Sequence, residues 1–229
     1  MQVGPSEEMT QDDFREAMRV HFWAPLRATL AVAPEMRRRG RGRIVNIASV
    51  GGLVSVPHML PYCASKFALV GLSEGWRVAL QKDGVYVTTV CPGVMRTGGH
   101  VNANFKGRHE QEFAWFGVAA SAPGFAVHAG RAADQILRAA RDGRALVIPA
   151  WPAKLLATLH ALAPALTAEG LALVDRALPR PGGIGGRQAS GGESRPAWLP
   201  PWLTRMGDRA AARNKELPPA GAPGGPGAL

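Results

Sequence analysis

The sequence predicts an α/β fold with a doubly wound parallel sheet of about three strands. Two segments, residues 44–49 and 85–91, are apolar and almost free of charge, as buried parallel strands are. An amphipathic helical pattern precedes the first strand over residues 12–38, and a second one over residues 62–81 separates the two strands. Strands and helices that alternate in this way are typical of a parallel sheet covered by helices.

The first helix is expected to begin at Thr10, which is followed by Asp13, a carboxylate suited to the positive end of a helix. Pro25 and Pro34 interrupt the helical spacing of its apolar residues and should bend or break it. Pro61 is expected at the start of the second helix, where proline is tolerated.

Beyond the second strand, residues 98–124 are predicted to be irregular, residues 127–141 to form an amphipathic helix and residues 145–148 a third strand. The irregular stretch contains several aromatic residues. A hydrophobic or bulky substrate and packing in the core explain these aromatic side chains equally well.

Residues 154–178 are predicted to form one or two apolar helices interrupted at Pro164, and they are too short to span a membrane. They could pack on the domain, mediate dimers or touch a membrane surface, and packing is the favoured alternative. We expect residues 1–178 to form one domain with these helices appended. Residues 179–229 are rich in proline and glycine and are expected to be a largely disordered tail.

The composition limits the function classes. The formal net charge is +10, but most of the basic residues are arginines in a chain also rich in alanine and glycine, and no basic-aromatic array accompanies them. A nucleic-acid partner is therefore disfavoured. The two cysteines have no metal-like spacing, and neither do the histidines, so no metal site is expected. A reducing, cytoplasmic location follows from this cysteine usage and from the polar, acidic start of the chain.

Three side chains are expected to converge at one edge of the sheet. Ser49 ends the first strand, at the edge where open α/β sheets bind ligands. Tyr62 and Lys66 are four residues apart and therefore share one face of the second helix. A lysine ammonium within about 4 to 6 Å lowers the pKa of a phenol, so that the tyrosine can exchange a proton with an alcohol or carbonyl oxygen.

Ser49, the Tyr62-x-x-x-Lys66 pair and the segment from Cys91 to Thr97 together resemble the short-chain dehydrogenase/reductase family. The resemblance extends from about residue 12 to about residue 149 and implies part of a Rossmann-type fold. It implies that Tyr62 is the catalytic acid/base, that Lys66 lowers its pKa and binds the nicotinamide ribose, and that Ser49 orients the substrate oxygen. The residues that it implies for binding the cofactor are Tyr62, Lys66, Pro92, Gly93, Val94 and Thr97.

The sequence departs from the family pattern in two places. His21 stands where many members have an asparagine that holds a water in the proton relay, and a histidine can also donate and accept hydrogen bonds. The glycine-rich dinucleotide motif of the family is not found, and residues 1–4 resemble those that directly follow its fourth strand. We therefore expect the chain to correspond to a family member without its first four strands.

Two hypotheses follow. The first is an NAD(P)-dependent oxidoreductase that interconverts a secondary alcohol and a carbonyl, acts on an apolar or bulky small molecule and forms homo-oligomers through residues 12–38 and 62–81. The choice between NAD and NADP is not readable. The alternative is a non-catalytic truncated remnant or interaction module of the same family, which cannot bind the cofactor by itself.

Overall fold

The structure is a computed structural model that describes residues 1–217. Its central sheet has three parallel strands in the order β2-β3-β7. The register pairs Gly42 with Val85 and Ile47 with Val90, so β2 and β3 are paired along their whole length. This confirms the predicted α/β fold with a small parallel sheet. The strands are β2 (Gly42–Ile47), β3 (Val85–Val90) and β7 (Leu146–Val147).

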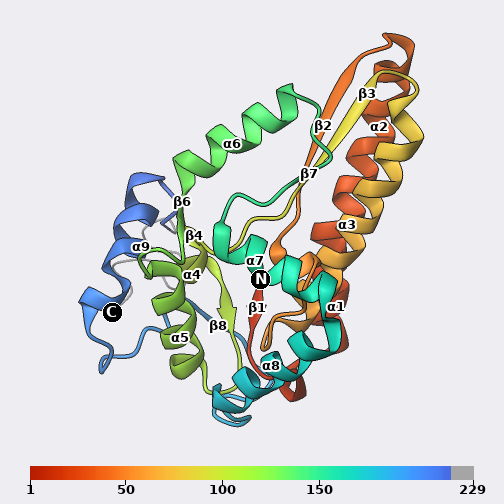
Figure 1. Cartoon of the computed structure of the whole chain (residues 1–229). Helices are drawn as coiled ribbons and strands as arrows, with labels where there is room; N and C mark the ends of the chain where they lie inside the picture. Colours follow the sequence, from red (N-terminus) through yellow and green to blue (C-terminus); the bar gives the residue numbers. More distant parts are fainter. Residues whose placement is uncertain (218–229) are drawn as a thin grey trace.

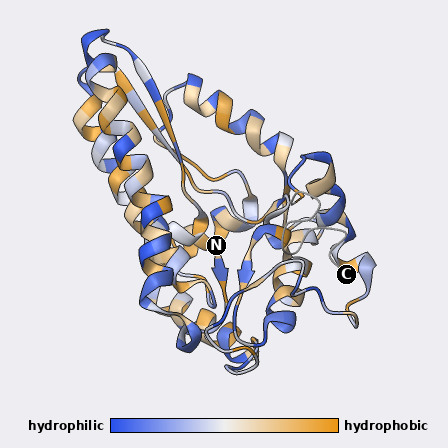
Figure 2. Cartoon of the chain, turned by 180° about the vertical axis from the view of Figure 1, so that it is seen from behind, coloured by the Kyte–Doolittle hydropathy of each residue, from blue (hydrophilic) through white to orange (hydrophobic). Residues whose placement is uncertain are grey.

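Two long helical segments run beside this sheet (Figure 1). Viewed from behind, they show hydrophobic and hydrophilic residues interspersed along their length (Figure 2). Leu80 on the second segment is fully buried with Val85 and Val87 of β3, which anchors this helix to the sheet. The helices are α1 (Gln11–Met18) and α2 (Ala24–Arg38), joined by a π-helical turn (Arg19–Trp23), and α3 (Leu60–Gln81).

The first helix begins as predicted, because the Asp13 carboxylate accepts hydrogen bonds from the backbone and the hydroxyl of Thr10 at 2.7 and 2.9 Å. Pro25 is the second residue after the π-helical turn. A proline has no N–H and its ring clashes with the carbonyl four residues earlier, so the helix widens at that point. Pro34 does not break α2, and water can replace its missing donor because Leu30 is half exposed.

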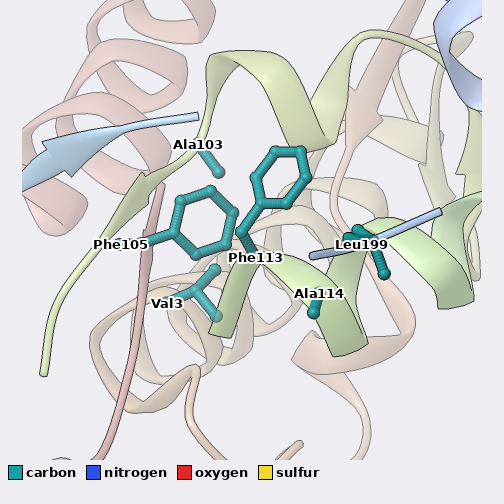
Figure 3. Packing of buried hydrophobic residues seen from close by; sticks show 6 residues of the cluster. All are labelled: Val3, Ala103, Phe105, Phe113, Ala114 and Leu199. Carbon is teal, nitrogen blue, oxygen red and sulfur yellow. The ribbon is translucent and has the colours of Figure 1, made fainter. Parts of the chain in front are cut away.

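Residues 98–124 are more ordered than the sequence pattern predicts. They form α4 (Gly99–Asn102), β5 (Asn104–Phe105) and α5 (His109–Ser121). The reason is a second core in which Phe105 and Phe113 are fully buried with ring centroids 5.6 Å apart (Figure 3). The aromatic residues of this stretch therefore serve packing, which was one of the two explanations considered. The other members of this core are Val3, Ala103, Ala114 and Leu199.

Residues 179–217 also differ from the expected disordered tail. They contain β8 (Ala189–Ser190), antiparallel to β5, and α9 (Pro201–Arg213). Leu199 is buried in the Phe113 core, and this contact orders a segment of low hydrophobicity. The expected disorder of residues 218–229 lies outside the described residues.

The remaining elements lie outside the three-stranded central sheet. The helical region after residue 150 forms two helices that meet at Ala163, as the proline at 164 predicted. Within residues 1–217, no helix has both the length and the low charge needed to cross a bilayer. These elements are β1 (Gln2–Val3), β4 (Met95–Arg96), β6 (Val127–His128), α6 (Ala129–Arg141), α7 (Trp151–Leu162) and α8 (Pro164–Ala177).

Candidate active site

The candidate site lies at the carboxyl ends of β2 and β3. Ser49 follows β2 and caps a single 3-10 turn, where its hydroxyl oxygen accepts a hydrogen bond from Gly51 N at 3.0 Å. Val50 N donates to the carbonyl of Pro92 at 2.8 Å. The loop after β2 and the turn after β3 are therefore held together at the edge where open α/β sheets bind ligands.

Helix α3 brings Tyr62 and Lys66 to this edge, as their spacing predicted. Lys66 is buried at 8% exposure, and its Nζ donates to the carbonyl of Ile47 at 2.9 Å. The ammonium lies 5.6 Å from the centroid of the Tyr62 ring. Lys66 is thus anchored to the end of β2 beside the phenol, and one helical turn carries both groups.

The pKa of Tyr62 is raised, which is opposite to the direction expected from the sequence. Burial is the main cause, because a phenolate loses more hydration than a phenol. A side-chain hydrogen bond with Ser49 acts the other way and lowers it. A phenol whose pKa is raised above its ordinary value is protonated at neutral pH, and the Lys66 ammonium is directed at the Ile47 carbonyl and the ring.

Burial is also the main cause of the pKa shift of Lys66. Desolvation lowers the pKa of its ammonium to about 8, with a small opposing effect from the nearby Cys91 thiol. Lys66 is therefore only weakly held in its charged form at physiological pH. An anion or a set of hydroxyl acceptors near Nζ would favour the charged form.

His21, on the π-helical turn, completes the group. Its ring meets the Tyr62 ring edge to face, with centroids 5.3 Å apart, and its Nδ1 lies 2.8 Å from Ser65 Oγ. The Ser65 hydroxyl already donates to the Tyr62 carbonyl at 2.7 Å, so Nδ1 carries the proton and Nε2 is an acceptor. Desolvation lowers the pKa of His21 to about 4, and the Lys66 charge adds to this shift.

A cleft of about 350 Å³ opens between α2 and β2, on the side of β2 that no strand covers among residues 1–217. Its polar lining residues include His21, Asn46 and Lys66. Asn46 is committed to structure, because its Nδ2 donates to Ser73 Oγ at 3.0 Å in the interior. His21, Lys66 and Thr29 remain as the polar lining residues, and the first two are ionisable.

The four residues expected to line a nicotinamide ring occupy the segment after β3. Pro92 is buried and tied to Val50, whereas the carbonyl of Val94 accepts from Val127 N at 3.0 Å. Gly93 lies against α7, where an added Cβ would come within 2.7 Å of Ala153 Cβ. Thr97 Oγ1 accepts from Gly99 N at 3.3 Å, so this segment is shaped by backbone contacts on both sides.

One buried pair near the site was missed in the sequence. His58 lies in the loop between Ser49 and Tyr62 with φ of 60°, and its Nδ1 is 2.8 Å from a carboxylate oxygen of Glu112, which is fully buried. Trp115 Nε1 donates to the same carboxylate at 2.7 Å. The partners are 54 residues apart, so no local pattern could have indicated the contact.

Comparisons with known proteins find matches over the part of the chain that holds this site. Residues 1–106 match the family model described as short chain dehydrogenase. Human 17-beta-hydroxysteroid dehydrogenase type 1 is 39% identical over 95 residues, and mouse retinol dehydrogenase 5 is 40% identical over 95 residues. Each match covers 42% of this chain and 29% of the relative, so the chain matches less than a third of either relative's length.

A solved structure extends the likeness beyond the motifs. A short-chain dehydrogenase from Streptomyces avermitilis superposes with a TM-score of 0.63 and 29% sequence identity, covering 77% of this chain and 67% of the other. The residues that match the family model include Ser49, Tyr62 and Lys66. Over residues 1–106, which hold this site, the chain is similar to the short-chain dehydrogenase/reductase family.

Proposed function

We propose that this chain carries the proton-transfer centre of an NAD(P)-dependent oxidoreductase that interconverts a secondary alcohol and a carbonyl. The convergence of Ser49, Tyr62 and Lys66 at the carboxyl ends of β2 and β3 is the observation that supports it most. Similarity to the family supports the same class of reaction.

Tyr62 is the proposed acid/base. Its raised pKa keeps the phenol protonated, which suits it to give a proton to the oxygen of a carbonyl that is being reduced. The oxygen of Ser49 accepts from Gly51 N, so the hydroxyl acts as a donor, and a substrate oxygen beside Tyr62 would take its hydrogen bond from the phenol. Alcohol oxidation requires the phenolate and is therefore expected to be favoured at alkaline pH.

The donor set fits the nicotinamide-ribose end of NAD or NADP. Lys66 has three N–H donors and spends one on Ile47, which leaves two for ribose hydroxyls. The neighbouring cleft and the Pro92, Gly93, Val94 and Thr97 segment are proposed to flank the ring. When bound, the nicotinamide supplies or accepts the hydride.

His21 is proposed to take the place of the relay asparagine found in many members. Its Nε2 is an acceptor that lines the cleft, and its low pKa keeps the ring neutral above about pH 5. A neutral imidazole can hold a water by that lone pair, beside the Tyr62 ring and close to Lys66.

The proposed substrate is an apolar secondary alcohol or its ketone. Two relatives are named for the oxidation of a hydroxysteroid and of retinol, both of them apolar alcohols. The polar groups around Tyr62 serve a single oxygen, and the cleft beside them has mostly apolar walls, including Val20, Val32 and Leu69.

Self-association through the helices before β2 and after it is also proposed. Four apolar side chains on the π-helical turn, α2 and α3 are between 43% and 79% exposed: Trp23, Leu30, Phe67 and Val78. Such apolar side chains on the outer faces of two adjacent helices are suited to a symmetric contact.

The test replaces each of the two tyrosines in turn. Tyr62→Phe removes the proton donor and should lower kcat/KM for a panel of apolar ketones by about 10²- to 10⁴-fold, followed by the absorbance of NADH or NADPH. Tyr86→Phe is the matched control, because Tyr86 lies on β3 and contacts the guanidinium of Arg43 instead. Equal rates for the two variants would disprove the proposed mechanism.

The open edge of β2 favours a second candidate, the non-catalytic interaction module. Fluorescence titration of the chain with NADH and NADPH distinguishes the oxidoreductase from the non-catalytic module. Saturable binding that Lys66→Met weakens supports the oxidoreductase. An absence of binding, together with an unchanged fold by circular dichroism, supports the module.

A further inference from the structure

The α7–α8 hairpin is apolar and yet hardly buried. Helix α7 buries only Ala153, and helix α8 buries no residue at all. Helices that are apolar on most sides are normally buried in a core or placed against lipid. This hairpin, at the surface of the molecule in Figure 1, therefore needs another surface to cover it.

The apolar residues of α7 form a stripe on its outer side. Ala153 packs against the Gly93 turn and fixes which side of the helix faces the body. The exposed residues recur every three or four positions and point away from that contact. They are Trp151 at 70% exposure, Leu155 at 51%, Leu159 at 50% and Leu162 at 79%.

Helix α8 repeats this arrangement. Asp175 Oδ1 lies 3.7 Å from His58 Nε2 and marks the side that faces the body. Leu166, Leu173 and Val174 are exposed at 74%, 63% and 51%. They are spaced seven and eight residues from the first, so they share one face. The two helices thus present two adjacent apolar stripes to solvent.

Cationic groups lie where the α8 stripe ends. A pocket of about 440 Å³ is lined there by Ala177 and Leu178, two arginines, Arg108 and Arg180, and two tryptophans. Within residues 1–217, no carboxylate lies within 4.0 Å of either guanidinium. The pocket and the net charge of +10 both favour a negatively charged partner.

We propose that the α7–α8 hairpin, with the adjoining Arg108–Arg180 pocket, docks on the surface of an anionic phospholipid bilayer. Helices of 12 and 14 residues are too short to span the hydrocarbon, but they can lie in the interface with leucines and a tryptophan inserted. Nearby arginines then meet lipid phosphates. A second copy of this chain fits less well, because it would bring the same two unpaired guanidiniums to the contact.

Docking does not depend on the proposed reaction, and it can be measured without any substrate. The full chain is co-sedimented with phosphatidylcholine vesicles that contain phosphatidylglycerol, and with phosphatidylcholine vesicles alone. Binding is expected only to the anionic vesicles. The double substitution Leu162→Glu and Leu166→Glu should weaken it by about tenfold or more, because it puts charge into both stripes.

Two comparisons sharpen the result. Leu137→Glu on α6 introduces the same charge at a 69% exposed position outside the hairpin, and it should leave vesicle binding unchanged. Arg108→Gln and Arg180→Gln should each weaken binding to anionic vesicles by about fivefold. Circular dichroism and thermal melting confirm that each variant is folded.

Three outcomes would overturn the proposal. One is that the wild-type chain does not sediment with anionic vesicles. Another is that Leu137→Glu weakens binding as much as the hairpin substitutions do. The third is that sedimentation velocity shows a wild-type dimer that Leu162→Glu dissolves while vesicles bind neither form, which would assign the stripes to a second copy.

Discussion

His21 is a half-buried imidazole whose surroundings oppose its charged form. Its folded pKa of about 4 lies below the unfolded value of 6.5, so between these pH values the unfolded chain binds a proton that the folded chain does not. Stability therefore rises as pH increases from about 4 to 6.5, and it is constant with respect to this group above that range. Solvent screening at a half-buried site limits the gain to about 2 kcal/mol.

His21→Asn should remove this increase of stability with pH. The variant has no titrating group at position 21, so its free energy of unfolding, measured by urea titration at several pH values, should lose the increase between pH 4 and 6.5. His128→Asn is the control, because asparagine also serves as a helix cap at that position. The same pH dependence in His21→Asn and the wild type would contradict the assignment of the low pKa.

The residues of the candidate site differ in how far the sequence alone could foresee them. The nearness of Tyr62 and Lys66 follows from helical spacing, and the position of Ser49 follows from the end of a strand. The direction of the Tyr62 pKa shift could not be foreseen. It depends on burial and on where the Lys66 ammonium is anchored, and both are set by contacts between distant parts of the chain.

The contact between α7 and the turn after β3 requires a residue without a side chain at position 93. An alanine Cβ there would come within 2.7 Å of Ala153 Cβ and 3.3 Å of Ala150 Cβ. Gly93→Ala should therefore displace α7 or strain the turn and lower the free energy of unfolding by about 1–3 kcal/mol. Thermal and urea unfolding measure the loss.

Gly71→Ala on α3 is a control for which the opposite change in the free energy of unfolding is expected. A Cβ at position 71 meets no atom within 4 Å, and alanine is the better helix former by about 1 kcal/mol. The α3 variant should be more stable than the wild type while the Gly93 variant is less stable. A Gly93→Ala protein that unfolds like the wild type would show that α7 does not depend on this contact.

Elements with a clear sequence pattern could be predicted, including the short strand β7, whereas helix α5 could not. Helix α3 and strands β2 and β3 have clear periods and clear ends, and their predicted bounds match within a few residues. Helix α5 has its apolar residues on nearly all sides, because one side faces the Phe105 core and the other faces α9. Without an amphipathic period, such a helix gives no periodic signal.

A buried ion pair connects three regions of the chain. Lys106 Nζ lies 2.5 Å from Asp13 Oδ2, and both side chains are almost fully buried. Gln188 Nε2 donates to the other oxygen of the same carboxylate at 3.0 Å. The start of α1, the loop after β5 and the segment before β8 thus share one carboxylate, so the segment after residue 178 contributes to the packed body.

A chain that ends at residue 178 tests how much of the fold this segment supports. Truncation removes Leu199 from the Phe105–Phe113 core and removes Asp208, whose Oδ1 lies 2.9 Å from the Nε2 of the fully buried His100. Exposed aromatic rings and a buried imidazole without its partner both destabilise the fold. The shortened chain should melt at a lower temperature than the full chain and bind the dye ANS, which reports exposed apolar surface.

A chain that ends at residue 217 is the matched comparison, because it keeps Leu199, Asp208 and the hydrogen bond from Gly98 N to the Glu216 carboxylate. It should melt at the same temperature as the full chain and bind no ANS. If the chain ending at residue 178 also melts at the temperature of the full chain, residues 179–217 do not contribute to the stability of the core. In that case, the expected domain boundary at residue 178 would be supported.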